Sequence, residues 1–227
     1  MWQALIGQDS PGRQSAGSAF LARIACLALI GFPLMLGGAA GQAQTLASLP
    51  NAGQLSEKGS AAKPILAWVK FCEQIAAECA VDPSEATTVQ LTPATWNTIV
   101  SINRRVNTRI KPITDKEHWG LVDRWEFPDD GAGDCEDFQL LKRRLLAERG
   151  IPRRAMRMTV VIDELGEGHA VLMVRTDRGD YILDNKTSAV LPWDQTGYVF
   201  VKRESQDAVA WVSLGGRTAS PTTTANR

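Results

Sequence analysis

The stretch 133–146 constrains the fold more than any other part of the sequence, because it combines a helix pattern with a cysteine near its start. Apolar residues recur there at the spacing of one helical face: Phe138, Leu141, Leu145 and Leu146. Asp134 and Asp137 resemble a capping box, so Cys135 is predicted in the first helical turn. Unpaired N–H groups and the helix dipole favour a thiolate there, and the thiolate is the nucleophilic form of cysteine.

Three carboxylates flank this cysteine, from Asp134, Glu136 and Asp137. Negative neighbours raise the pKa of a thiol and so oppose the reactive form. Two interpretations remain open. The acids either only complement the helix dipole, or a histidinium or a bound cation offsets their charge.

The N-terminus resembles an export signal. Residues 24–40 are apolar and small, Arg13 and Arg23 precede them, and residues 41–43 read Gly-Gln-Ala. We predict a cleaved signal peptide over 1–43, and hence a periplasmic protein. An uncleaved membrane anchor is the alternative, but a proline and several glycines make this stretch a poor membrane-spanning helix.

The rest of the chain reads as one domain with flexible ends. Residues 44–62 are rich in Ser, Ala and Gly and predict a linker, 63–214 a single domain, and 215–227 a disordered tail. The sequence contains 25 basic and 25 acidic residues and no basic patch with interleaved aromatics, which argues against nucleic-acid binding. We expect no organic cofactor.

Three cysteines remain after signal cleavage. In an oxidising compartment Cys72 and Cys79 are expected to form a disulfide, which leaves Cys135 as a free thiol. Residues seven apart on a straight helix lie roughly 10 Å apart, beyond disulfide reach. The helix that opens at Pro64 should therefore end near Ala77. The alternative is two separate buried thiols.

A second helix is predicted after Thr92 as N-cap, with Pro93 in the first position. Its expected inward stripe contains Trp96, Ile99, Val100, Asn103 and Val106. The connection 111–130 that follows is rich in aromatic residues. It either packs over the domain or walls a groove beside Cys135.

The pattern then changes to strands, at 155–162, 169–176, 180–183 and 198–201, with a hairpin signal at 177–179. Short connections between consecutive strands imply an antiparallel sheet. A cysteine-bearing helix followed by such a sheet predicts the α+β class.

One of the two histidines opens a strand: His169 follows a glycine-rich loop and begins an apolar run. Asp184 closes the next strand, where a carboxylate could orient the imidazole of a Cys-His-Asp triad. A simple hairpin, however, places Asp184 opposite Met173, roughly 13 Å from His169 along the strand. The register must shift for the two to touch. His118 as the base and Asn185 as the orienting group are alternatives.

Three sequence motifs occur in this order: Gly-Asp-Cys-Glu-Asp-Phe, Gly-His-Ala-Val-Leu and Tyr-Ile-Leu-Asp-Asn. Together they resemble the bacterial transglutaminase-like cysteine proteinases, the family that includes the LapG-type periplasmic proteases. Further similarity lies at Phe71-Cys72 with Cys79, Val106-Asn107, Trp119-Gly120, Asp123, Trp125 and Trp211. The resemblance covers roughly residues 64–212.

The resemblance implies a papain-like transglutaminase core with Cys135 as nucleophile, His169 as base and Asp184 as its orienting group. Cys135 would attack a peptide carbonyl and form a thioester that water resolves, with its own N–H and a second donor holding the oxyanion. An amidase or transglutaminase, passing the acyl group to an amine, is one alternative. A non-catalytic periplasmic binding module is another.

The resemblance also implies a cofactor and partners. LapG-type members bind calcium through acids flanking the cysteine, and Asp134 and Glu136 match those positions, with Asp137 a further candidate. Such an ion would supply the missing positive charge. The best understood members cleave a large surface adhesin under control of an inner-membrane receptor, which makes an adhesin the expected protein substrate.

Overall fold

The protein is described by a computed structural model, which describes residues 52–216. The predicted signal peptide, 1–43, lies outside the described residues, as do 44–51 and 217–227. Within residues 52–216 no helix has both the length and the apolar character needed to cross a membrane.

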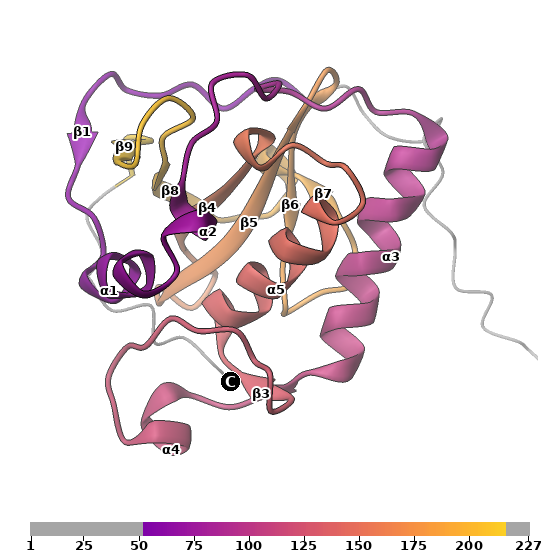
Figure 1. Cartoon of the computed structure of the whole chain (residues 1–227). Helices are drawn as coiled ribbons and strands as arrows, with labels where there is room; N and C mark the ends of the chain where they lie inside the picture. The colour runs from indigo at the N-terminus through magenta and orange to yellow at the C-terminus, as the bar shows by residue number, and fades with distance from the viewer. Residues whose placement is uncertain (1–51, 217–227) are drawn as a thin grey trace, which may run out of the picture. The chain divides into compact units, whose positions relative to one another are not determined.

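The centre of the fold is a seven-stranded sheet in which every pair of neighbouring strands is antiparallel (Figure 1). The strand order is β1-β9-β8-β4-β5-β6-β7. The strands are β1 Ala61–Ala62, β4 Met156–Ile162, β5 Gly168–Thr176, β6 Gly179–Leu183, β7 Leu191–Pro192, β8 Val199–Glu204 and β9 Trp211–Ser213. A second, two-stranded parallel sheet pairs β2 Lys111–Pro112 with β3 Ala132–Gly133.

The helices lie mostly before the sheet strands in sequence. They are α1 Leu66–Gln74, α2 Ala76–Cys79, α3 Pro93–Arg109, α4 Asp115–Trp119 and α5 Cys135–Ala147, with short 3-10 turns at Arg153–Ala155 and Trp193–Gln195. The predicted α+β class is therefore confirmed. Helix α3 begins as predicted, because the Thr92 side chain accepts a hydrogen bond from Thr95 N at 3.1 Å.

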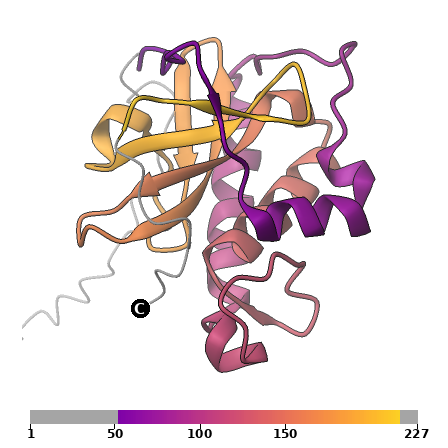
Figure 2. The ribbon, with the colours of Figure 1, turned by 90° about the vertical axis from the view of Figure 1, so that its left-hand side faces the viewer.

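Helices and sheet form two layers, which Figure 2 shows from the side, with α3 in magenta and the sheet in orange and yellow. Helix α5 packs between α3 and strands β4 and β5. The main apolar core fills this interface and includes Trp96, Phe138, Leu140, Met158, Leu172 and Tyr181. A second apolar cluster contains Leu55, Val161, Val171, Met173, Ile182, Phe200 and Leu214. Because strand side chains alternate between faces, Val161, Val171 and Met173 project from the sheet face opposite α5.

The predicted Cys72–Cys79 disulfide is present, with the two Cα atoms 5.6 Å apart. The geometric condition is met because α1 stops at Gln74 and Ile75 leaves the helical region with φ −130° and ψ 64°. The chain then forms the single turn of α2, which returns Cys79 toward Cys72. The helix thus ends slightly earlier than the predicted Ala77.

Residues 52–62 differ from the flexible linker that their composition predicts. Leu55 N donates to Asp180 Oδ2 at 2.7 Å, and Glu57 accepts from the buried Arg203 at 2.8 Å. Strand β1 then adds to the sheet edge beside β9. Small and polar residues are compatible with this strap because its contacts are made largely by backbone groups and charged side chains.

Candidate active site

The β5–β6 hairpin brings His169 and Asp184 together. Thr176 pairs with Gly179, so the turn is the two-residue loop at 177–178, and Leu183 pairs with Leu172. Compared with the simple hairpin, this register moves Asp184 two residues closer to His169 along the neighbouring strand. As a result, His169 Nε2 lies 2.8 Å from Asp184 Oδ1. The register shift that was expected to be necessary for this contact is therefore present.

Asp184 is buried and holds three hydrogen bonds on its carboxylate. Besides His169, the Tyr198 hydroxyl donates to Oδ2 at 2.6 Å and Lys186 N donates to Oδ1 at 3.0 Å. Burial alone would raise the pKa of Asp184, but the hydrogen bond and charge of His169, with the bonds from Tyr198 and Lys186, lower it to about 2. The carboxylate is therefore ionised and firmly oriented at neutral pH.

Cys135 occupies the first position of α5, as predicted, and its side chain is fully buried. Ala170 N, the residue after His169, donates to the Cys135 sulfur at 3.4 Å, which places the thiol against the start of β5. Burial and the charge of Asp134 raise the pKa of Cys135 well above its usual value. The thiol is protonated in this structure's environment, despite its position at a helix N-terminus.

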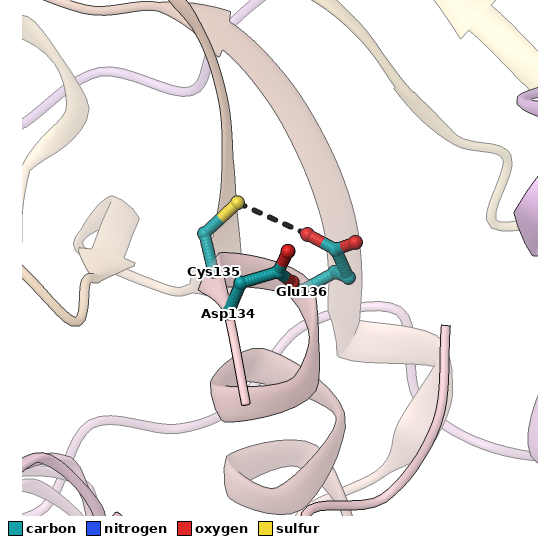
Figure 3. Close-up of side chains that lie close together, drawn as sticks. All are labelled: Asp134, Cys135 and Glu136. Atoms are coloured by element: carbon teal, nitrogen blue, oxygen red, sulfur yellow. Dashed lines mark hydrogen bonds between the residues drawn. The ribbon is translucent and has the colours of Figure 1, made fainter. Parts of the chain in front are cut away.

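The thiol proton is directed at a carboxylate. Figure 3 shows the first turn of α5, where Cys135 Sγ donates to Glu136 Oε2 at 3.1 Å. Asp134 precedes it as the N-cap, and its backbone N–H donates to Asp137 Oδ2 at 3.2 Å, one half of the predicted capping box. Glu136 and Asp137 are as deeply buried as the cysteine.

Two further acids from the connection 111–130, Asp115 and Asp123, join this group, and the sequence did not assign either of them to a metal site. One carboxylate oxygen from each of Asp115, Asp134 and Asp137 lies within 4.8 Å of the others. The same holds for the group Asp115, Asp123 and Glu136. We call Asp115, Asp123, Asp134, Glu136 and Asp137 the acid cluster. The connection 111–130 also packs over the domain, since Trp125 is buried and contacts Trp211 edge-on.

Full ionisation of the acid cluster is unfavourable, because most of its carboxylates are buried and they lie close to one another. Burial, with the charges of neighbouring acids, raises the pKa of Asp115 to about 6 and that of Asp134 to about 7. Glu136 and Asp137 are raised further by the same causes. Asp134 Oδ1 and Glu136 Oε1 are buried and accept no hydrogen bond from any part of the chain that the structure describes. These residues fit a hard cation, which would bind their free oxygens.

The alternatives for base and orienting group are placed elsewhere. His118 lies in α4, where its Nε2 pairs with Asp130 at 2.8 Å and its ring stacks on Trp119. Asn185 accepts a long contact from Gln139 Nε2 at 3.5 Å, while the carboxylate of Asp184 is the group that meets His169. Both positions support the pairing of His169 with Asp184.

Tyr198 is a site residue that the sequence did not reveal. It was predicted only as the first residue of a strand, yet its ring meets the His169 ring edge-on at 5.9 Å and its hydroxyl holds Asp184. No spacing in the sequence connects position 198 to position 184. A tyrosine at the exposed end of a strand was the one available signal.

The chain is similar to known proteins in sequence and in fold. The family model described as "Bacterial transglutaminase-like cysteine proteinase BTLCP" matches residues 57–219. Legionella pneumophila LapG is a similar solved structure, with 24% identity, a TM-score of 0.46, and coverage of 56% of this chain and 72% of LapG. Its calcium-bound form has 25% identity, a TM-score of 0.47, and coverage of 58% and 75%. The EGTA-treated form has 26% identity, a TM-score of 0.43, and coverage of 50% and 64%.

No curated protein sequence matches the chain. The family model alone spans well over half of it, including Cys135, His169 and Asp184. This chain therefore belongs to the bacterial transglutaminase-like cysteine proteinases and is a cysteine peptidase.

Proposed function

We propose that the chain is a periplasmic cysteine peptidase in which Cys135 is the nucleophile, His169 the general base and Asp184 its orienting group. The observation that carries this proposal is the 2.8 Å contact between His169 Nε2 and Asp184 Oδ1, next to the Ala170 N–H that contacts the Cys135 sulfur. Cys135 is the first residue of α5, His169 lies at the start of β5 and Asp184 follows β6, and these positions support the proposed triad.

The orientation of the imidazole supports Nδ1 as the nitrogen that transfers the proton. Because Asp184 accepts from Nε2, the neutral ring carries its hydrogen there and leaves Nδ1 as the basic nitrogen. Nδ1 is buried and has no hydrogen-bond partner among residues 52–216. Nδ1 takes the proton of the thiol as the sulfur attacks the peptide carbonyl, and returns it to the leaving amine. A water molecule, activated by the same nitrogen, then hydrolyses the thioester.

The oxyanion is held at the same helix N-terminus. The backbone N–H of Cys135 is in the first turn of α5, where N–H groups lack partners within the helix. Together with a second donor, it stabilises the charge on the carbonyl oxygen during attack. Cys135 and His169 are closed to solvent, so a substrate enters only after neighbouring side chains move.

The acid cluster is proposed to hold calcium. Asp134, Glu136 and Asp137, joined by Asp115 and Asp123, offer the carboxylate oxygens that calcium prefers. A bound calcium ion supplies the positive charge that neutralises these acids and lowers the pKa of the neighbouring thiol. The calcium ion would also attract the Glu136 carboxylate more strongly than the Cys135 thiol proton does.

Export to the periplasm is supported by the signal-peptide pattern of residues 1–43 and by the disulfide between Cys72 and Cys79. Fractionation of cells, followed by N-terminal sequencing of the mature protein, tests this. Gln44 is expected as the first residue. A cytoplasmic protein that starts at Met1 would contradict the proposal.

The substrate is proposed to be a protein, and the specific candidate is a large surface adhesin controlled through an inner-membrane receptor. This rests on family resemblance. Deletion of the gene is expected to change the amount of adhesin at the cell surface and the amount of biofilm. Unchanged adhesin and biofilm would overturn this part of the proposal and leave the peptidase assignment standing.

The catalytic assignment is tested by intact-mass labelling with a thiol-directed peptidase inhibitor. The mature protein is labelled in calcium and in chelator, as wild type, His169→Ala and His118→Ala. Labelling at Cys135 should be fast with calcium, slow in chelator and slow in His169→Ala, while His118→Ala behaves as wild type. Slow labelling under every condition would show that Cys135 is an ordinary thiol. Incorporation of an added amine into protein substrates, without chain cleavage, would instead indicate acyl transfer.

A further inference from the structure

Lys142 is a fully buried lysine for which the catalytic proposal has no role. It lies on α5, seven residues after Cys135, so the two are about two helical turns apart on the same side of the helix. Its ammonium group is 5.9 Å from the centre of the Phe138 ring. Nζ has no hydrogen-bond partner within the part of the chain that the structure describes.

An ammonium group in this position is unfavourable unless a negative charge compensates it. Burial lowers the pKa of Lys142 to about 7, and Asp184 is the described residue whose charge acts in the opposite direction. The neighbouring cation on α5, Arg143, is already paired with Glu204 at 2.7 Å. The loop that begins at Asp184 also lies against this part of α5, because Gln139, one turn before Lys142, donates to the Asn185 side chain at 3.5 Å.

Besides Asp184, the elements packed against α5 carry Arg157 on β4 and His169 and Arg175 on β5, at positions that alternate with the apolar core residues. The arginines of α3, at 104, 105 and 109, are exposed. Helix α5 packs against α3, β3, β4 and β5. Strands β4 and β5 contribute apolar core residues, and β3 consists of Ala132–Gly133. Helix α3 contributes amides: Asn107 Nδ2 donates to Asp184 O at 2.7 Å, and Asn103 Nδ2 donates to Ser188 O at 3.2 Å. These bonds fix the loop 184–188 against the helical layer.

Several buried polar groups of helices α3 and α5 lack hydrogen-bond partners among residues 52–216. The side-chain oxygens of Asn103, Asn107 and Gln139 are buried and accept no hydrogen bond from residues 52–216. Gln139 lies one turn before Lys142 on α5 and reaches Asn185, the residue after Asp184. The polar side chains of α3 and α5 thus converge on the loop that carries Asp184, and Lys142 is the positive charge among them.

We propose that Lys142 is a positioning residue, whose ammonium group balances the Asp184 carboxylate from the helix side while His169 is neutral. This inference rests on the proposed roles of His169 and Asp184. When His169 takes the proton of Cys135, the imidazolium and Lys142 become two cations beside one carboxylate. Lys142 therefore weakens the hold of His169 on that proton and favours its return to the leaving amine.

The test measures the imidazole directly by NMR titration. The mature calcium-loaded protein carries Cys135→Ala, so that His169 titrates without the thiol. Lys142→Met removes the charge and keeps an apolar stem of similar length. The chain has two histidines, so His118 is an internal control. Lys202→Met is the control for loss of a lysine elsewhere, because Lys202 is half-buried, lies on β8 and donates to Lys63 O.

Lys142→Met is expected to raise the midpoint of the His169 titration by about one pH unit, the size of a cation's effect at several ångströms in a protein interior. His118 should not move, and Lys202→Met should leave both midpoints unchanged. Lys142→Arg, which keeps the charge, should restore the wild-type midpoint. An unchanged His169 midpoint in folded Lys142→Met, or an equal shift in Lys202→Met, would overturn the proposal.

A second measurement covers the case in which Lys142→Met does not fold. In the protein with its native lysine, Asp184→Asn should lower the titration midpoint of the Lys142 ammonium group, observed by carbon NMR of labelled lysine. No change would overturn the proposal. Both readouts are independent of Cys135 reactivity, so an inert thiol would refute the peptidase mechanism while leaving the Lys142–Asp184 coupling measurable.

Discussion

His169 Nε2 lies 2.8 Å from Asp184 Oδ1 because the β5–β6 hairpin turns at 177–178. Gly179 pairs with Thr176 and has φ +114°, a left-handed conformation that glycine tolerates best. The Thr176 hydroxyl donates to Gly179 O at 2.8 Å and accepts from Arg178 N at 3.0 Å. The tight turn thus sets the register that brings His169 and Asp184 into contact.

Tyr198→Phe is predicted to lower the catalytic rate without weakening substrate binding. The variant removes the 2.6 Å hydrogen bond to Asp184 Oδ2, one of three that orient the carboxylate. A hydrogen bond to a charged group contributes about 1.5 kcal/mol or more, which corresponds to roughly a tenfold loss in kcat. Kinetics on a peptide substrate should show this loss with KM unchanged.

Tyr181→Phe is the matched control for this experiment, since the chain has two tyrosines and the Tyr181 ring packs on Trp96 in the main core. It should leave kcat unchanged. Equal losses in the two variants, or a loss confined to KM, would show that Tyr198 does not act through Asp184.

The metal-free protein is predicted to lose stability as pH rises from about 4 to about 7. Burial and mutual repulsion raise the pKa of Asp115 to about 6 and that of Asp134 to about 7 in the folded state. A raised carboxyl pKa contributes stability that is complete below the unfolded value and is lost as pH passes the folded value. Thermal melts in chelator should therefore show a falling Tm over this range.

Calcium should reverse this trend, because the ionised acids are then paired with a cation. The increase in Tm on adding calcium is expected to be larger at pH 7.5 than at pH 5. Asp134→Asn should flatten the dependence in chelator, whereas Asp129→Asn, at an exposed position beside Arg144, should not. A metal-free Tm that rises between pH 4 and 7 would contradict the predicted repulsion.

The regular elements could be predicted because local patterns specify them, whereas the pairing of His169 with Asp184 was expected from the family resemblance. Thr92 and Pro93 mark the start of α3, and the apolar spacing after Cys135 marks α5. The antiparallel strands follow from runs rich in Val, Ile, Met and Tyr and from the hairpin signal at 177–179. The register of the hairpin could not be predicted, since a two-residue loop can lie at 177–178 or at 178–179, and the two positions give different strand pairings.

The remaining site residues come from tertiary packing, for which one sequence carries little signal. Asp115 begins the short helix α4 and Asp123 follows that helix, in a connection whose path depends on Trp125 entering the core. Tyr198 reaches Asp184 across a loop, and Glu57 of the strap pairs with the buried Arg203. Each contact joins segments far apart in sequence, so residue spacing alone could not predict it.

Replacing Cys72 and Cys79 with serine is predicted to lower the free energy of unfolding by about 2 kcal/mol, at the lower end for disulfides because the closed loop is short. The disulfide holds α2, whose Glu78 O accepts a hydrogen bond from Arg143 on α5 at 3.1 Å. Denaturant titration of the double variant measures the loss. Inhibitor labelling of Cys135 at 25 °C should be unchanged, and a large decrease would show that α2 supports the site.

Gly179→Ala is predicted to destabilise the fold far more than Gly166→Ala, although both glycines have positive φ, +114° and +81°. A Cβ at Gly179 would lie 1.7 Å from Ala52 O, whereas one at Gly166 would meet nothing within 4 Å. Gly166→Ala therefore reports backbone strain alone, of order 1 kcal/mol. Gly179→Ala adds the displacement of the strap 52–62, whose Leu55 N bonds to Asp180 beside this glycine.

Thermal melts of the two variants measure the difference. If the strap is part of the domain, Gly179→Ala should lower Tm by several degrees more than Gly166→Ala and should make residues near Leu55 more accessible to proteases. The same strap is predicted to be a flexible linker by composition alone. Equal Tm losses in the two variants would support that reading, because a flexible segment moves away from an added methyl group at little cost.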